Sequence, residues 1–304
     1  MSEKAEAAPA VAKELRVLES PSRLKQYDKC QFLMQLTYDE RWEPKEAAPS
    51  LIARIAGTAF SRACELAHTA IRDGNVSLLD DSAFIRVAVE ESLALFDKQF
   101  KFCIDKEIRF APNKDSIVKT ELARVIPQYF AQTPVRQWKK VTDVETPIPA
   151  YGLRPDLGGI DEEEIDVVGD VKYKATCRAG YYESTVEEFQ HDTQFKNYNY
   201  GWQKYKGLKD KPCRSTLILV VGHPFSVRAH PFVYHNHILE EHIDAAKIRS
   251  EEIAEYKRGE RSLVEALTHR DHFGWCPMKK ACLEQHRNRE MMKLDYVQLI
   301  GMPD

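Results

Sequence analysis

The stretch RPDLGGIDEEEIDVVGDVKYKAT (residues 154–176) decides how this chain folds. Its two halves, RPDLGGID and IDVVGDVKYKAT, are rich in apolar and β-branched residues, which predicts two strands joined by a tight acidic turn at Glu162–Glu164. Because successive side chains of a strand point to opposite faces, Asp170 and Lys172 share one face of the second strand. Asp156 lies on the first strand, so the hairpin is expected to bring two aspartates and a lysine together.

These three side chains allow two interpretations. Carboxylates from adjacent strands can bind one hard cation such as Mg²⁺ or Mn²⁺, and a lysine beside it can activate or position a water for phosphodiester hydrolysis. Alternatively, the segment is a solvated surface hairpin, because acids are common in turns and D-x-K is a common pattern. The apolar neighbours of Asp170 in VVGDV argue against the surface hairpin, since a buried carboxylate is costly unless it is paired.

The 304-residue chain is long enough for a large core, and its 43% hydrophobic and 30% charged residues are typical of a globular protein. Its longest apolar run, TLILVVG (216–222), is too short to cross a bilayer. Residues 1–17 carry no signal or transit pattern and are expected to form a flexible tail, which together with seven cysteines favours a reducing, cytoplasmic setting. At a net charge of −3, nucleic-acid binding would need a local basic patch such as KYKGLKDKPCR (204–214).

The pattern of apolar residues changes along the chain. Residues 18–135 are mainly helical, with helices predicted at 20–38, 51–71, 81–102 and 116–132, the last kinked near Pro127. Residues 136–240 form the sheet-bearing core, with an extended stretch at 139–152, the hairpin, one long helix at 185–207, and strands at 215–224 and 230–238. Residues 241–304 contain most of a charged helix (239–259) and a cysteine-bearing segment. The predicted fold class is α/β, with a small mixed sheet flanked by helices in a single compact unit.

The order of these motifs resembles the PD-(D/E)XK nuclease superfamily. Pro155-Asp156, thirteen intervening residues and Asp170-Val171-Lys172 match its signature, and Gln194 with Tyr198 matches the Q-x-x-x-Y element of the RecB-like branch, which includes CRISPR-associated RecB-like exonucleases. The resemblance implies a restriction-endonuclease-like core that hydrolyses DNA at single-stranded or free ends. It assigns the metal to Asp156, Asp170 and the main-chain carbonyl of Val171, and DNA or active-site contacts to Gln194 and Tyr198. Helicases, recombination proteins or CRISPR proteins would be its partners.

The resemblance also extends to a cysteine cluster. In that branch, four cysteines distant in sequence meet at one iron–sulfur cluster, to which the resemblance assigns Cys30, Cys276 and Cys282 here. The fourth cysteine is missing, which leaves His272 as a fourth ligand or a cluster with three protein ligands. A [4Fe–4S] cluster is expected, zinc is the alternative metal, and three buried thiols are the alternative without metal. A cluster would hold the N-terminal helix and the C-terminal segment together as a metal clasp.

One position departs from the family pattern. The first-helix motif G-T-x-x-H-x-x-x-E runs here from Gly57 to Glu65, with Ser61 in place of the metal-binding histidine. Glu65 is expected to supply a further oxygen to the metal, whereas His68 is interpreted as a structural histidine. The serine leaves one alternative open, a weakened relative that binds DNA or a partner without cutting. Without the resemblance, the alternative is a metal-binding α/β protein of unknown role.

Overall fold

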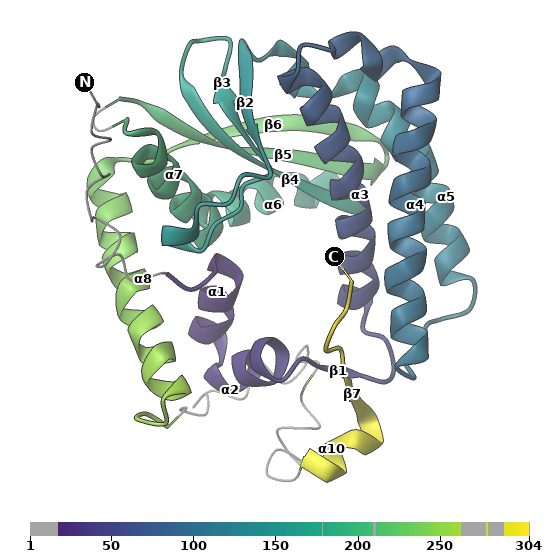
Figure 1. Ribbon diagram of the computed structural model, residues 1–304, viewed down its shortest axis with the longest axis vertical. Coiled ribbons are helices and arrows are strands. Elements are labelled where there is room, and N and C mark those ends of the chain that lie inside the picture. The colour runs from purple at the N-terminus through teal and green to yellow at the C-terminus, as the bar shows by residue number, and fades with distance from the viewer. Residues whose placement is uncertain (1–17, 178, 209–210, 263–277, 279–288, 304) are drawn as a thin grey trace, which may run out of the picture.

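The computed structural model describes residues 18–177, 179–208, 211–262, 278 and 289–303. Its centre is a five-stranded sheet in the order β2-β3-β4-β5-β6. The strands are β2 (Lys140–Val144), β3 (Leu157–Ile160), β4 (Asp166–Thr176), β5 (Cys213–His223) and β6 (Ser226–Val233). Strands β4 and β5 run parallel and the other neighbours run antiparallel. The predicted α/β class, with a mixed sheet flanked by helices, is therefore confirmed (Figure 1).

The N-terminal part is mainly helical, as the periodicity predicted. Its helices are α1 (Pro21–Lys29), α2 (Gln31–Met34), α3 (Pro49–Arg72), α4 (Ser82–Asp105) and α5 (Lys114–Gln132). Short 3-10 or π turns lie at Gln35–Asp39, Val76–Asp80, Pro134–Gln137, Pro149–Tyr151 and Ala179–Tyr181. Helices α3, α4 and α5 pack side by side (Figure 1), and α5 continues past Pro127 to Gln132. Within the described chain, no helix is long and apolar enough to span a membrane.

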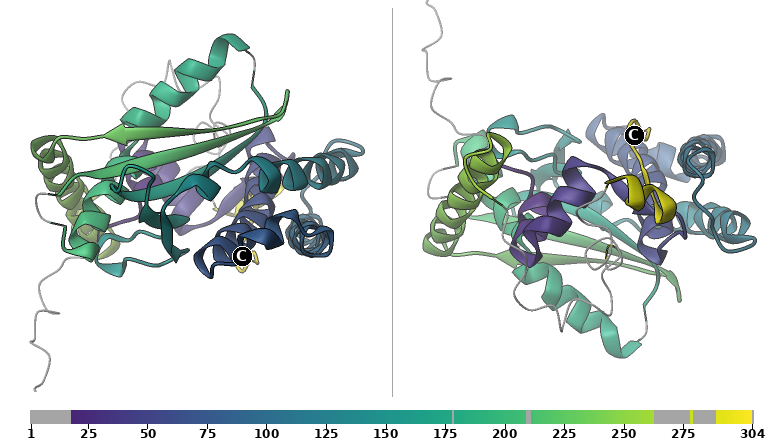
Figure 2. Two further views of the ribbon diagram at one scale, coloured as in Figure 1. Left: turned by 90° about the horizontal axis from the view of Figure 1, so that it is seen from above. Right: turned by 90° about the horizontal axis from the view of Figure 1, so that it is seen from below.

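Both faces of the central strands are covered by helices, which explains their continuous apolar sequences. On one face, Val171, Ile218 and Val220 join the main core formed with α3 and α5. On the opposite face, the alternate residues Leu217 and Leu219 pack under α6 (Tyr182–His191) and α7 (Thr193–Lys206). Figure 2 shows the sheet between these two helical layers.

The single long helix predicted for residues 185–207 is wrong, because the structure divides it at Asp192. This residue has extended backbone, with φ −66° and ψ 138°, and its carboxylate caps α7 by accepting a hydrogen bond from the main-chain N–H of Gln194. Aspartate is among the strongest N-cap residues, so a local cap overrides the helical periodicity. The break lets α6 and α7 lie at different angles on the sheet (Figure 2).

Helix α8 (Asn236–Lys257) begins earlier than predicted, because β6 spans residues 226–233 instead of the expected 230–238. It packs against α1 through a small apolar cluster that includes Leu24, Tyr27, Ile243 and Ile253. Helix α1 therefore lies against the core domain although its residues come first in the described chain (Figure 1).

The N-terminal part and the C-terminal segment of the described chain meet at a pair of short strands. Strand β1 (Trp42–Pro44) pairs antiparallel with β7 (Tyr296–Gln298), which follows α10 (Arg289–Asp295). An apolar cluster beside this pair joins Leu33 and Leu36 with Met278 and Met292. The N-terminal helices and the C-terminal segment are thus joined by backbone pairing and by apolar packing.

Candidate active site

The candidate site lies where β3 and β4 separate. Their pairing runs from Ile160 opposite Asp166 to Leu157 opposite Gly169, and stops there. Asp156, one residue before β3, turns its carboxylate toward β4, and its Oδ2 accepts a hydrogen bond from the main-chain N–H of Val171 at 2.6 Å. Asp156 therefore replaces the missing strand partner and is fixed next to Asp170.

Asp170 and Lys172 lie on the face that the alternation predicted. The Lys172 Nζ is 2.5 Å from Asp170 Oδ2, and the side chain of Asp170 is 2% exposed while that of Lys172 is 31% exposed. Apart from this ion pair, the buried Oδ2 makes no hydrogen bond within the described residues. The surface-hairpin interpretation is therefore wrong for this carboxylate, because Asp170 is buried and paired.

Helix α7 adds two side chains to the site. Gln194 Nε2 donates to Asp170 Oδ1 at 2.8 Å and to the hydroxyl of Tyr198 at 2.9 Å, and this hydroxyl donates to the carbonyl of Arg154 at 3.2 Å. The amide nitrogen of Gln194, and not its oxygen, faces Asp170, because a carboxylate accepts from the nitrogen and repels the oxygen. The spacing of four residues places Gln194 and Tyr198 on one face of the helix.

The charges at this site are not balanced. Burial raises the pKa of Asp156 well above its usual value, and the Asp170 carboxylate raises that pKa further. Burial also raises the pKa of Asp170, while Lys172 acts in the opposite direction. Burial disfavours the ammonium of Lys172, but the two carboxylates outweigh burial and raise the pKa of this lysine. Two acids therefore share one ammonium group, and a bound cation would relieve the remaining repulsion.

Glu145 is a further acid at the site that sequence reasoning missed. Its main-chain N–H donates to the carbonyl of Asp156 at 3.1 Å, and its Oε2 lies 2.9 Å from Arg154 Nε. Burial raises the pKa of Glu145; Arg154 lowers it, and the carboxylates of Glu65 and Asp170 raise it. In the sequence it is one of several polar residues in an extended stretch and belongs to no motif, so no local signal identifies it.

The first-helix residues occupy α3. Glu65 pairs with Arg62, whose Nη1 lies 2.5 Å from its Oε2, and acts on Glu145 through its charge. His68 is fully buried and its Nε2 shares a hydrogen bond with the Tyr129 hydroxyl at 2.8 Å. Burial lowers the pKa of His68 to about 3, so it is a neutral structural histidine in the core, as interpreted from the sequence.

The donors gathered at this site suit a hard divalent cation. They are the carboxylates of Asp156 and Asp170, with the main-chain carbonyl of Val171 as the third predicted ligand. Across the described ranges, no three His, Cys, Asp or Glu side chains form a ligand group for a metal ion. Water would then complete the coordination shell, as it does for Mg²⁺ at many sites with one or two protein carboxylates.

The acidic turn and the expected basic patch neutralise each other in part. Arg214 pairs with Asp161 at 2.8 Å and with Glu163 at 2.6 Å. Lys206, in the same basic stretch, pairs with Asp143 at 2.6 Å. These ion pairs weaken residues 204–214 as a binding patch for a polyanion, because two of its cations already have carboxylate partners.

The cysteine cluster is only partly within the described chain. Cys30 is half-buried, its Sγ accepts a hydrogen bond from the main-chain N–H of Leu33 at 3.4 Å, and it packs beside the apolar cluster that contains Met278. Cys276, Cys282 and His272 lie outside the described residues.

No protein-family model matches the chain, and no curated protein does. Among solved structures, the chain is similar to a crystal structure from Eubacterium rectale described as a candidate exonuclease, with 13% sequence identity, a TM-score of 0.49 and coverage of 94% of each chain. What the site can do chemically therefore follows from its own contacts.

Proposed function

We propose that this protein is a divalent-metal-dependent nuclease that hydrolyses phosphodiester bonds of DNA. The observation that carries the proposal is the pairing of buried Asp170 with Lys172 at 2.5 Å, next to Asp156, at the point where β3 leaves β4. The order and spacing of these residues in the PD-(D/E)XK pattern supports the same activity.

Each side chain has a distinct role in this proposal. Asp156, Asp170 and the Val171 carbonyl would hold Mg²⁺ or Mn²⁺, which when bound would polarise a phosphoryl oxygen and lower the pKa of a water. Lys172 carries a full charge and is partly exposed, so its ammonium can position the attacking water or stabilise charge that develops on the phosphate. Gln194 holds Asp170 through Oδ1, which leaves Oδ2 directed toward Lys172.

The test is cleavage of end-labelled single-stranded DNA with Mn²⁺, with Mg²⁺ and with EDTA. Lys172→Ala is expected to lower the Mn²⁺-dependent rate about 100-fold or more, the loss typical of removing one charge-stabilising group. Lys174→Ala is the matched control: it lies two residues further along the same face of β4, and its Nζ contacts Thr185 at 3.4 Å and no carboxylate within the described chain. Equal rates for the parent and Lys172→Ala would show that the site is wrong.

The same assay, with strands labelled internally, separates the finer alternatives. An exonuclease cuts linear single-stranded DNA and spares a circular strand of the same sequence, whereas an endonuclease cuts both. DNA binding by the parent without cleavage in either metal would favour the weakened, binding-only alternative. We propose exonuclease action on free or single-stranded ends, with a helicase, recombination or CRISPR protein as the partner that supplies them.

We also propose a metal clasp, an iron–sulfur cluster or zinc, ligated by Cys30 with Cys276, Cys282 and His272. Its support is that Cys30 packs beside the apolar cluster of Met278, a residue between the two C-terminal cysteines in sequence. Cys30→Ala should lose bound iron or zinc and be cut faster by protease near both ends, whereas Cys177→Ala, a half-buried thiol elsewhere, should not. A parent protein without iron or zinc would contradict the clasp.

A further inference from the structure

We propose that Lys25 and Asp192 are positioning residues for Gln194, so that the docking of helix α1 on the core is required to assemble the active site. This inference rests on the proposed nuclease function for its role in catalysis. It depends on a continuous series of polar contacts from α1 to Asp170, in which every link is a short contact between named atoms.

The first link joins α1 to the cap of α7. The Lys25 Nζ lies 2.5 Å from Asp192 Oδ2, and the side chain of Asp192 is only 8% exposed. The other oxygen, Oδ1, accepts a hydrogen bond from the main-chain N–H of Gln194 at 2.9 Å. Both carboxylate oxygens are therefore engaged, one by the lysine of α1 and the other by the first turn of α7.

The second link joins that first turn to the site. Gln194 lies two residues after its N-cap, and its amide donates to both Asp170 Oδ1 and the Tyr198 hydroxyl. The first turn of a helix depends on its cap, because its N–H groups have no partner inside the helix. A change in the position of Asp192 therefore moves Gln194 relative to Asp170.

Lys25 also stabilises the buried charge of the cap. A carboxylate that is nearly excluded from water is costly unless a cation pairs with it. Among the described residues, a second acid near Lys25 is Glu188, whose Oε1 is 4.0 Å from the lysine Nζ and whose side chain is 68% exposed, so it competes weakly. Without Lys25, Asp192 would turn toward water or toward other donors and would cap α7 less well.

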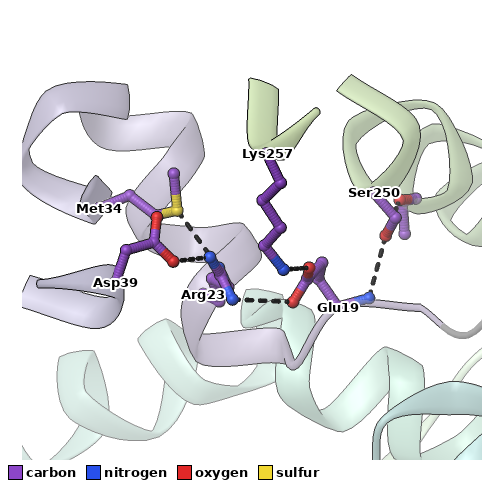
Figure 3. A network of polar contacts seen from close by, with 7 residues as sticks. Glu19, Arg23, Met34, Asp39, Ser250 and Lys257 are labelled. Atoms are coloured by element: carbon purple, nitrogen blue, oxygen red, sulfur yellow. Dashed lines mark hydrogen bonds and ion pairs between the residues drawn. The ribbon is translucent and has the colours of Figure 1, made fainter. Parts of the chain in front are cut away.

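Several contacts keep α1 in place, independently of Lys25. The main-chain N–H of Glu19 donates to Ser250 Oγ at 3.1 Å, and Lys257 Nζ donates to Glu19 Oε1 at 2.6 Å (Figure 3). Arg23 bridges Glu19 and Asp39 in the same network (Figure 3). These contacts supply a matched control, because Lys257→Met removes a contact between α8 and Glu19, just before α1, without touching Asp192.

The experiment compares Lys25→Met, Gln194→Ala, the double variant and Lys257→Met by steady-state cleavage of single-stranded DNA and by DNA-binding affinity. Lys25→Met is expected to lower kcat about tenfold with unchanged DNA affinity, the effect of weakening one hydrogen bond to a charged group. If Lys25 acts through Gln194, the double variant is as slow as Gln194→Ala alone. Lys257→Met should keep the parent kcat.

A second readout does not depend on cleavage: the rate of hydrogen exchange at the Gln194 main-chain amide, which donates a hydrogen bond to Asp192 in the parent. This exchange rate should rise in Lys25→Met and stay unchanged in Lys257→Met. Any of three results would overturn the positioning role. They are a parent-like kcat in Lys25→Met, a double variant whose loss of kcat is the product of the two single losses, and an unchanged exchange rate of the Gln194 amide in Lys25→Met. If the parent cuts no DNA, the proposed function fails, and the exchange measurement alone then decides whether Lys25 positions the start of α7.

Discussion

The carboxylate of Asp156 bonds to the main chain of Val171, at 2.6 Å, rather than to another side chain. Asp156 lies one residue before Leu157 and Val171 two residues after Gly169, the last paired positions of β3 and β4, so a side chain takes over the hydrogen bond that the strand no longer provides. This contact places Asp156 beside Asp170 without any flexible link between them. The contact therefore holds Asp156 on the sheet next to Asp170, as the proposed metal site requires.

The charge on Asp156 should destabilise the metal-free protein at neutral pH. Its pKa is raised above the usual 3.8, so the folded state binds a proton more tightly than the unfolded state. Stability is therefore expected to fall as the pH rises from about 3.8 through the raised pKa. Asp156→Asn should be more stable than the parent at pH 7, by about 1–3 kcal/mol, and should lose this advantage near pH 4.

Urea unfolding at several pH values measures this difference, with EDTA present to remove metal. Asp166→Asn is the control, because Asp166 begins β4 at the end of the β3–β4 pairing opposite to Asp156. An Asp156→Asn variant less stable than the parent at both pH values would mean that the carboxylate stabilises the fold.

Mn²⁺ should stabilise the folded protein if it binds the proposed site, because only the folded state holds the two aspartates together. At a free concentration of about 100 times its Kd, one bound ion adds about 2.7 kcal/mol to the free energy of unfolding. Thermal unfolding of the parent with Mn²⁺ should show this increase, and that of Asp170→Ala should not. A similar Mn²⁺ effect on both proteins would place the metal elsewhere.

Gly158 is expected to tolerate no side chain. A Cβ built there would lie 1.9 Å from Cη2 of Trp202, whose ring is fully buried in α7. Gly158→Ala must push β3 away from α7, so it should destabilise the protein by about 1–3 kcal/mol and lower cleavage by displacing Asp156.

Gly57 provides the contrasting case for the same chemical change. A Cβ at this helical position meets no atom within 4 Å, so Gly57→Ala should stabilise the protein by about 0.5–1 kcal/mol. Urea unfolding of both variants checks the pair, and equal effects on stability would contradict the close packing of Trp202 on β3.

His68 should contribute to the core and not to metal binding. Its hydrogen bond to Tyr129 is buried, so Tyr129→Phe leaves Nε2 without a partner and should cost about 1–3 kcal/mol of stability. The Mn²⁺ concentration that gives half-maximal cleavage should stay unchanged in this variant. A large shift in that concentration would show that the histidine contacts the metal after all.

The local patterns of the chain predicted most of the fold and the centre of the site. Asp170 and Lys172 are two residues apart on a strand, and Gln194 and Tyr198 are four apart on a helix, so the backbone geometry alone puts each pair on one face. The apolar sequence of β5 likewise indicated a central strand, because it must bury both faces. The break at Asp192 was missed because a helical apolar period continues across it.

The sequence by itself determined which elements form and which polar residues they carry on a common face, because these depend on backbone periodicity over a few residues. Only the tertiary structure brought Glu145 beside Asp156, and Lys25 to Asp192 across 167 positions of the chain. Such contacts leave no periodic trace in a sequence. They arise when helices and strands from distant segments pack, and burial then makes each unpaired charge costly enough to require the partner that packing provides.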